Sequence, residues 1–362
     1  MSRQRWSPVI PATLSLLPLC VGQISLADEV SEFYRGIRMM GMGGAGVAIA
    51  VEDEAIYLNP AAMAANPRLK LKAVTDLAVS TTIVNSYLSG EFATLSDPSL
   101  EVLEQVVGRF LYLGGAASPS LVMPNFGISV YGDQKVGLGI ENTALPNIEV
   151  NFMQTYGVQG AAGYSFPLMR GKRPSEIRVG VGGKYLYRKG RVWNEKLADL
   201  FSISTDALLE RAGAFYSSYG FDLGLQYIQP INRHVSSQFG LSYQNIGGID
   251  FDAETAANIP GNLSVGGAVI FGATSMGQIT VAYDLRQLNQ EVDFRKRSHL
   301  GLEIKLPVIT LWAGLNQTYL TYGGAVDFWL ARAGFVVFKE ELGALSFQRP
   351  DSRWMLRLEL KL

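Results

Sequence analysis

The final stretch of the sequence, RWMLRLELKL (353–362), alternates strictly between two kinds of side chain. Successive side chains of a β-strand point to opposite faces, so this period of two predicts a strand. A strand with one apolar and one charged face separates two different environments. The apolar face carries Trp354, Leu356, Leu358, Leu360 and Leu362, and the other face carries Arg353, Arg357, Glu359 and Lys361.

The same alternation recurs along the chain, with second faces made mostly of Gly, Ser, Gln and charge. Examples are IRVGVGGKYLYRKG (177–190), VSSQFGLSYQ (235–244), LSVGGAVIF (263–271), ITVAYDLR (279–286), LGLEIKL (300–306) and LWAGLN (311–316). Strands of about ten residues with almost no charge on the apolar face favour an all-β, transmembrane antiparallel β-barrel, with a polar lumen and tyrosines near the strand ends. We count about 14 strands, give or take two. The alternative is a soluble exported β protein, which would partition away from membranes.

The N-terminus has the layout of a secretory signal peptide. Arg3 and Arg5 precede an apolar stretch from about Val9 to Val21, and the sequence SLA comes before acidic residues. We therefore expect a signal peptide over residues 1–27, export, and location in the outer membrane of a Gram-negative type cell. A lipoprotein acylated on Cys20 is the alternative, although the bulky Leu19 stands where small residues are wanted.

Composition argues against several classes of function. The 31 basic and 32 acidic residues leave no basic excess, so nucleic acid is not an expected partner. His234 and His299 are the only histidines, and both are interpreted as solvated loop residues. No metal-ligand spacing and no GxSxG motif is present. We expect no enzyme activity, no cofactor and no metal.

The stretch RMMGMGGAGVAIAVEDEAIYLNPAAM (38–63) contains Gly41-x-Gly43-x-x-Gly46, which has the spacing of a dinucleotide-binding fingerprint. That motif needs a buried strand before it and an acidic residue about 20 positions later. A polar segment precedes it here, and PAAMAAN occupies the later window. The glycines instead predict close backbone packing and positive φ angles in a segment that enters a barrel lumen.

Two segments interrupt the strand pattern with helical spacing. DPSLEVLEQVVGRFLYL (97–113) offers Asp97 as N-cap and Pro98 at the first helical position, and NEKLADLFSISTDALLERAG (194–213) predicts a second helix that ends near Gly213. Unpaired backbone is not tolerated in lipid, so we expect short helical loop inserts outside the bilayer or folded into the lumen.

The stretch GMGGAGVAIAVEDEAIYLNPAAMA (41–64) resembles the N-terminal motif of FadL-type outer-membrane proteins, in which a glycine and alanine stretch is followed by acidic residues and an Asn-Pro-Ala turn. Asn59, Pro60 and Ala61 match that turn, whereas Ala62 replaces the usual glycine. The tail from Lys339 resembles TraF-like relatives. Leu362 departs from the terminal aromatic residue of many barrels.

The resemblance implies a 14-stranded barrel (68–362) with an N-terminal plug (28–67) in its lumen. It further implies passive uptake of hydrophobic small molecules, such as long-chain fatty acids or hydrocarbons, with release into the outer-membrane lipids. PorV- and PorQ-like relatives share the motif and serve as partners in protein secretion or envelope assembly, which is the alternative function, and the aromatic stretch FYSSYGF (215–221) is the candidate docking surface for it. The expected plug or gating residues are Gly41, Gly43, Gly44, Gly46, Asn59, Pro60 and Ala61, and the candidate ligand contacts are Met39, Met40, Met42 and Met63.

Overall fold

A computed structural model describes residues 32–89, 108, 110–140, 147–168, 174–196, 207, 210–251, 258–274 and 277–361 of the chain. The expected signal peptide, Cys20, Leu362 and most of the first helical insert lie outside these residues. Of the second insert, Ala207, Glu210 and Arg211 are helical, and Gly213 follows with a φ of 84°.

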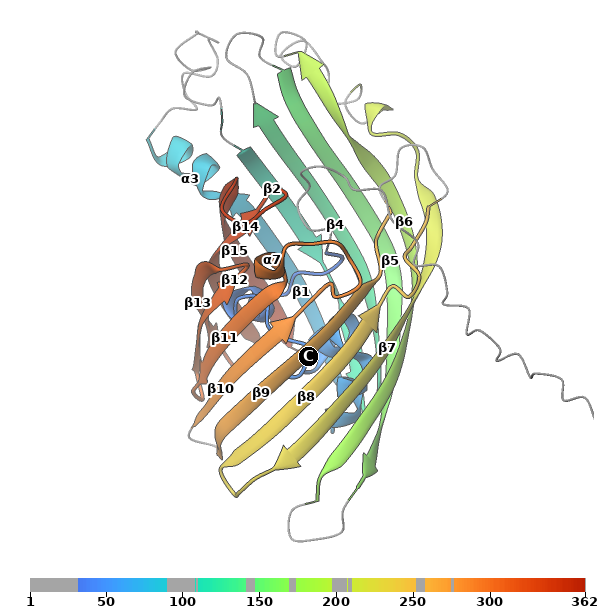
Figure 1. Ribbon diagram of the computed structural model, residues 1–362, viewed down its shortest axis with the longest axis vertical. Helices are drawn as coiled ribbons and strands as arrows, with labels where there is room; N and C mark the ends of the chain where they lie inside the picture. The colour runs from blue at the N-terminus through green and yellow to red at the C-terminus, as the bar shows by residue number, and fades with distance from the viewer. Residues whose placement is uncertain are drawn as a thin grey trace, which may run out of the picture.

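Fifteen strand segments form one antiparallel sheet that closes on itself (Figure 1). Closure joins the two ends of the sheet, where β1 pairs with β15 from Lys72↔Lys361 to Ser80↔Arg353. The segments are β1 (Lys70–Ser80), β2 (Phe110–Ala117), β3 (Ser120–Met123), β4 (Phe126–Ile140), β5 (Asn147–Pro167), β6 (Glu176–Lys196), β7 (Tyr216–Pro230), β8 (Val235–Gln244), β9 (Asn262–Thr274), β10 (Gly277–Leu285), β11 (Ser298–Lys305), β12 (Ile309–Asn316), β13 (Tyr319–Asp327), β14 (Ala331–Glu341) and β15 (Pro350–Lys361).

Segments β2 and β3 are two parts of one strand. Both lie between β1 and β4, and both keep the same register on each neighbour. The break falls at Ser118 and Pro119, where proline has no backbone N–H to continue the ladder. The barrel therefore has 14 strands, which confirms the predicted fold class.

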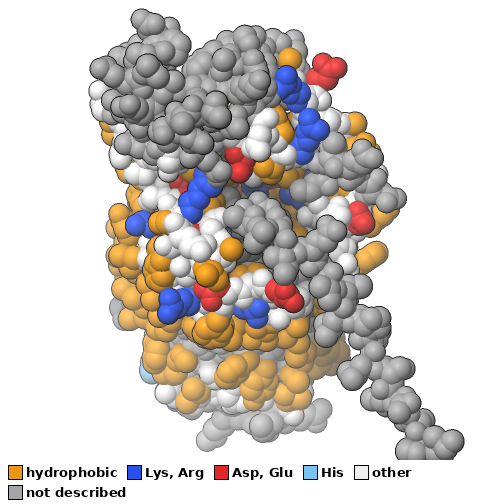
Figure 2. Space-filling model, turned by 45° about the horizontal axis from the view of Figure 1, so that its top comes forward, with side chains coloured by type: hydrophobic (Ala, Val, Ile, Leu, Met, Phe, Trp, Pro, Cys, Tyr) orange, Lys and Arg blue, Asp and Glu red, His pale blue; other side chains and the backbone are white. Residues whose placement is uncertain are grey.

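The two faces of the strands are the ones that the alternation predicted. Leu356, Leu358 and Leu360 of β15 face outward, while Arg353, Arg357 and Glu359 are buried on the lumen side. In Figure 2, apolar side chains cover the flank of the barrel below the charged upper part. Tyr156 and Tyr164, both exposed on the outer face of β5, lie eight residues apart, which is about 26 Å at ~3.3 Å per residue. That spacing fits two aromatic girdles around a lipid-facing band.

Strand length and connection length both differ around the barrel. β5 and β6 have 21 residues each, whereas β11 and β12 have 8, so the prediction of uniform ten-residue strands is wrong for the tall side. The connections that follow β3, β7, β11 and β13 are short turns at one end, which outer-membrane barrels direct to the periplasm. We call this end the short-turn end.

Before β1, the chain lies inside the barrel, and we call residues 32–69 the N-terminal segment (blue in Figure 1). Most residues between Tyr34 and Met63 are buried. The segment contains α1 (Ile37–Gly41), α2 (Asp53–Leu58) and the 3-10 helix η1 (Pro60–Ala65). Elsewhere α3 (Thr81–Leu88) follows β1, and α7 (Phe294–Arg297) precedes β11. Among the described residues, no helix is both long and apolar enough to cross a bilayer.

Candidate functional site

The glycine turn of the N-terminal segment lies directly against two strands of the wall. Gly43 and Gly44 have φ angles of 65° and 89°, in the region that favours glycine. A Cβ atom on Gly43 would lie 2.4 Å from the carbonyl oxygen of Leu300, and one on Gly44 would lie 2.3 Å from the ring of His299. The turn therefore needs glycine both for its backbone conformation and for its approach to β11 and β12.

Polar side chains of the wall bind the backbone of this turn. The Asp284 carboxylate of β10 accepts hydrogen bonds from the N–H groups of Gly46 (2.6 Å) and Val47 (2.8 Å). The Thr321 hydroxyl of β13 donates to the carbonyl of Gly41 at 3.1 Å. These bonds satisfy backbone groups that the turn would otherwise leave unpaired in a buried site.

His299 is not the solvated loop residue that the sequence predicted. It is the second residue of β11, points into the lumen, and is buried with its Nδ1 atom 2.8 Å from the carbonyl oxygen of Gly43. The basic connection before it, Phe294–Arg297, forms a short helix, and β11 begins at Ser298, two residues before the predicted start of this strand at Leu300. His234 is exposed in the turn after β7, as expected.

Asn59 links two parts of the N-terminal segment to the wall. Its amide nitrogen donates to the carbonyl of Val47 at 3.0 Å and lies 3.3 Å from the carbonyl oxygen of Leu225 on β7. Its amide oxygen accepts from the N–H of Ala61 at 3.1 Å, which caps η1. Asn59 is fully buried, so water cannot reach its amide group. These protein groups therefore supply the hydrogen bonds of the Asn59 amide.

Glycines on the inner face of the barrel wall lie against the N-terminal segment on most of its sides. At each of these positions a Cβ atom would come within about 3.1 Å of the N-terminal segment. At Gly180, for example, it would lie 2.3 Å from the backbone of Pro60 and Ala61. We call this set the glycine belt: Gly127, Gly163, Gly180, Gly224, Gly240, Gly266, Gly301, Gly314 and Gly334, on β4 to β9, β11, β12 and β14.

The four methionines proposed as ligand contacts are buried in the same packing. Met42 lies against Gly301, Met63 lies against Gly127, and Met39 contacts Arg286. All four, including Met40, have at most 1% of their surface exposed. In this conformation they fill the space between the N-terminal segment and the wall.

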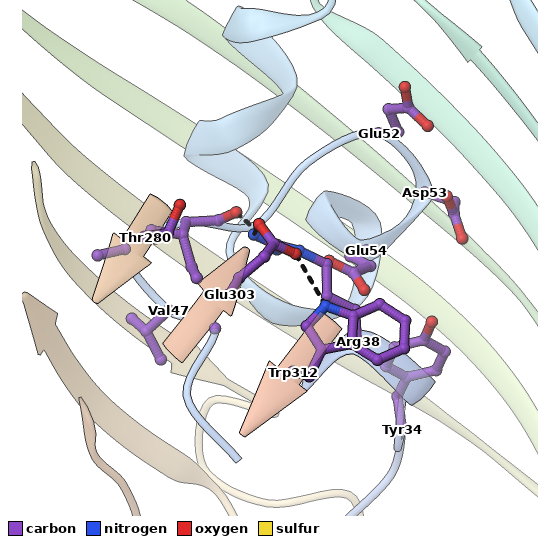
Figure 3. Close-up of polar contacts among 12 residues, drawn as sticks. Tyr34, Arg38, Val47, Glu52, Asp53, Glu54, Thr280, Glu303 and Trp312 are labelled. Carbon is purple, nitrogen blue, oxygen red and sulfur yellow. Dashed lines mark hydrogen bonds and ion pairs between the residues drawn. The ribbon is translucent and has the colours of Figure 1, made fainter. Parts of the chain in front are cut away.

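Arg38 forms the main ion pair between the N-terminal segment and the strands (Figure 3). Its guanidinium donates to both carboxylate oxygens of Glu303 on β11, at 2.6 and 3.0 Å, and lies 3.2 Å from Glu54. The indole of Trp312 donates to the same Glu303 at 3.0 Å. Burial alone would lower the pKa of Arg38, but Glu303 and Glu54 raise it above its ordinary value. Burial raises the pKa of Glu54, and Arg38 offsets part of this effect.

A second ion-pair group holds the turn between Val51 and Asp53. Glu52 has a φ of 53°, which is unusual for a residue with a side chain, and it pairs with Lys70 and Lys72 of β1. Lys72 also lies 2.6 Å from Asp53 and 3.0 Å from Glu359. Burial would raise the pKa of Glu52, but the two lysines lower it to about 2.

Aromatic side chains of the N-terminal segment pack on one another and on β4 of the wall. Tyr34 stacks on Tyr57 with ring centroids 4.1 Å apart, and Phe33 lies 4.8 Å from Tyr131. The Tyr57 hydroxyl donates to Ser129 at 2.6 Å. A cavity of about 50 Å³, mostly apolar, lies between Tyr34 and the wall.

A cavity of about 740 Å³ lies at the short-turn end. We call it the vestibule. Its lining is strongly charged, because it includes Arg38 and Glu52 from the N-terminal segment and basic and acidic residues from the ends of β1, β11, β13, β14 and β15. Among the described residues, no group of three or more His, Cys, Asp or Glu side chains could hold a metal ion.

Arg38, Asp284 and Glu303 were missed as site residues by the sequence analysis. Asp284 and Glu303 lie on the polar faces of predicted strands, so the sequence pattern indicated that they face the lumen. The pattern could not identify the partner of Glu303, because Arg38 is 265 residues away in the sequence. The glycine belt had a visible signal, since glycines recur on the polar faces of successive strands.

Comparisons with known proteins find similarity in structure alone. Neither a protein-family model nor a curated protein sequence matches the chain. The CymD monoaromatic hydrocarbon channel matches with 10% identity and a TM-score of 0.46, over 90% of this chain and 96% of that one. The toluene transporter TbuX of Ralstonia pickettii matches with 12% identity and a TM-score of 0.47, over 92% and 98%. The translocator domain of the autotransporter NalP from Neisseria meningitidis matches with 7% identity and a TM-score of 0.33, over 81% and 88%.

The similar barrels include hydrocarbon channels and the translocator domain of an autotransporter. At TM-scores below 0.5, these similarities do not identify a substrate for this chain. The chain's own strand pairing establishes the 14-stranded barrel with an N-terminal segment in its lumen.

Proposed function

We propose that this protein is an outer-membrane channel for the passive uptake of hydrophobic small molecules, and that residues 28–67 act as its plug. One observation carries the proposal: the segment inside the lumen is a stretch of chain before β1, docked through side-chain contacts rather than by strand pairing. Such a segment can move without opening the sheet.

The glycines and Asn59 are the proposed gating residues. Gly43, Gly44, Asn59 and Pro60 form the contacts that seal the segment against the wall. Displacement of these contacts would expose the buried methionines to the lumen. Methionine suits varied apolar ligands, because its side chain is flexible and polarisable.

The alternative function in protein secretion had FYSSYGF (215–221) as its candidate surface. Tyr216–Phe221 open β7, and Tyr219 and Phe221 are exposed on the outer face. Tyr219 packs on Tyr185 with centroids 4.7 Å apart. This position beside Tyr156 and Tyr187 favours an interfacial girdle over a protein-docking loop.

The proposal is tested by measuring uptake of labelled solutes into proteoliposomes that contain the barrel. In a double-cysteine variant, the proposed plug can be linked covalently to the wall. A Cβ atom on Gly334 would lie 3.0 Å from the Cδ1 atom of Ile37, so Ile37→Cys with Gly334→Cys can be joined by oxidation or by a short thiol crosslinker. We expect the joined double variant to lose uptake of radiolabelled toluene and palmitate, and reduction of a disulfide to restore it. Each single variant is the control. Unchanged uptake through the tethered barrel would overturn the proposal.

A further inference from the structure

The vestibule carries more basic than acidic side chains. Its basic lining residues are Arg38, Lys70, Lys72, Lys305, Arg332 and Lys361, and its acidic ones are Glu52, Glu303, Asp327 and Glu359. Four of the basic residues have close carboxylate partners: Arg38 with Glu303, Lys70 and Lys72 with Glu52, and Lys361 with Asp327 at 2.5 Å. The remaining two are Lys305 and Arg332.

Lys305 and Arg332 are the cations available to a ligand. Lys305, at the end of β11, is exposed and forms no ion pair with the residues that the structure describes. Arg332 lies 3.8 Å from Asp327, which Lys361 already occupies, and its guanidinium lies over the ring of Trp312. Both cations therefore line the same cavity, and neither has a carboxylate partner that it does not share. An anionic ligand would neutralise their charge.

The rim beside these cations is unusually apolar. The turn after β11 (306–308) and the turn after β13 (328–330) are adjacent, because the N–H of Asp327 donates to the carbonyl of Val308 at 2.7 Å. Trp329 has 93% of its surface exposed. The exposed apolar residues of these two turns are Leu306, Val308, Phe328, Trp329 and Leu330. They continue the lipid-facing surface of Ile309, Val326 and Leu360, so the rim lies at the membrane interface.

We propose that this rim binds an anionic phospholipid of the periplasmic leaflet, with its phosphate on Lys305 and Arg332 inside the vestibule and its acyl chains over the turns 306–308 and 328–330. Two cations that line one cavity, on β11 and β14, and apolar residues at the rim of that cavity match the two parts of such a lipid. An arginine can bind phosphate through two parallel N–H groups, and Lys305 adds a point charge. This site does not depend on the proposed transport function.

Lipid titration of the purified full-length barrel, followed by native mass spectrometry, tests the site. The probes are dioleoyl phosphatidylglycerol, dioleoyl phosphatidylcholine and palmitate. For Lys305→Gln with Arg332→Gln we expect phosphatidylglycerol affinity to fall about 30-fold, at ~1 kcal/mol for each cation. For Trp329→Ser we expect a fall of about threefold to tenfold, because less apolar surface meets the acyl chains.

The matched control uses another turn at the same end of the barrel. Ile231→Ser with Arg233→Gln removes one exposed apolar residue and one exposed cation from the turn after β7, and should leave phosphatidylglycerol affinity unchanged. Equal losses in both double variants, or no loss in Lys305→Gln with Arg332→Gln, would overturn the proposal. Saturable binding of palmitate alone would also overturn it, because a free carboxylate would then be the ligand. Migration of each variant in unheated gels checks that the barrel is folded.

Discussion

The N-terminal segment meets two different walls. On one side, Asn59 and η1 pack against β5 to β8 through glycines and neutral amides, including Gln159, which donates to the carbonyl of Ile56 at 2.7 Å. On the other side, Arg38 and Glu52 meet β1 and β11 through ion pairs. The neutral side depends on shape and excludes water, whereas the charged side adjoins the vestibule, where water and ions can compete.

This difference indicates where the segment would first come away from the wall. The packing of Asn59 and η1 against Gly163, Gly180 and Gly224 cannot be released in part, because no space for a Cβ atom is left at these contacts. The Glu52–Lys70 pair keeps 30% and 42% of its side-chain surface exposed beside the vestibule, so it can exchange its partners for water at a lower cost. We therefore interpret the neutral side as the anchor and the charged side as the releasable side.

The largest expected effect comes from filling the neutral side. Gly180→Leu would place side-chain atoms where the backbone of Pro60 and Ala61 now lies, so η1 could not dock. We expect amides of residues 55–65 to lose their protection and to exchange with deuterium at the rate of undocked chain, with the barrel still inserted. Hydrogen-exchange mass spectrometry in detergent measures this. Gly183→Leu is the matched control, because a Cβ at Gly183 meets nothing within 4 Å. Normal protection in Gly180→Leu would show that the anchor lies elsewhere.

A smaller effect is expected from breaking the charged side. Glu303→Gln would leave Arg38 buried opposite a neutral amide, which costs about 3–5 kcal/mol for a buried pair. The double variant Arg38→Met with Glu303→Gln removes both charges and should recover much of that loss. The measurement is a double-mutant cycle on the exchange rates of residues 37–54. Additive effects of the two changes would mean that the ion pair does not hold the segment.

Asn59→Ala is expected to cost about 2 kcal/mol of docking free energy, because the carbonyl of Val47 and the N–H of Ala61 would lose a partner in a buried site. Exchange rates of residues 46–61 report this loss. Asn66→Ala serves as the control, since the amide of Asn66 is also buried but, among the described residues, donates only to the sulfur of Met63, at 3.7 Å. Similar losses for both asparagines would contradict the role of Asn59.

The sequence predicted the barrel and the faces of its strands because a period of two is a local property. The alternation at Leu356, Leu358 and Leu360 needs no knowledge of the rest of the chain. It also predicted that the glycine turn packs closely, but it could not place Gly43 against β11 and β12. That contact depends on barrel closure and on how deep the segment sits. His299 was misassigned because the boundary between α7 and β11 is set by strand register, which the sequence does not show.

The smallest expected effect concerns pH on the charged side. Glu52 has an ordinary pKa of 4.5, which Lys72 and Lys70 lower to about 2 in the folded protein, against the effect of burial. A carboxyl group with a lowered pKa stabilises the folded state fully above its unfolded value, and this contribution is lost as pH falls through the folded value. We therefore expect protection of residues 50–54 to be constant above about pH 5 and to weaken between pH 4.5 and pH 2.

Glu52→Gln separates this titration from general acid effects, because it removes the group while keeping its size. The variant should show weaker protection of residues 50–54 at neutral pH and a flatter response between pH 4.5 and pH 2. Residues 59–63, on the neutral side, should hold their protection over the same range. Loss of protection on both sides at one pH would mean that the segment docks as a single unit, and that the anchor and the releasable side are not independent.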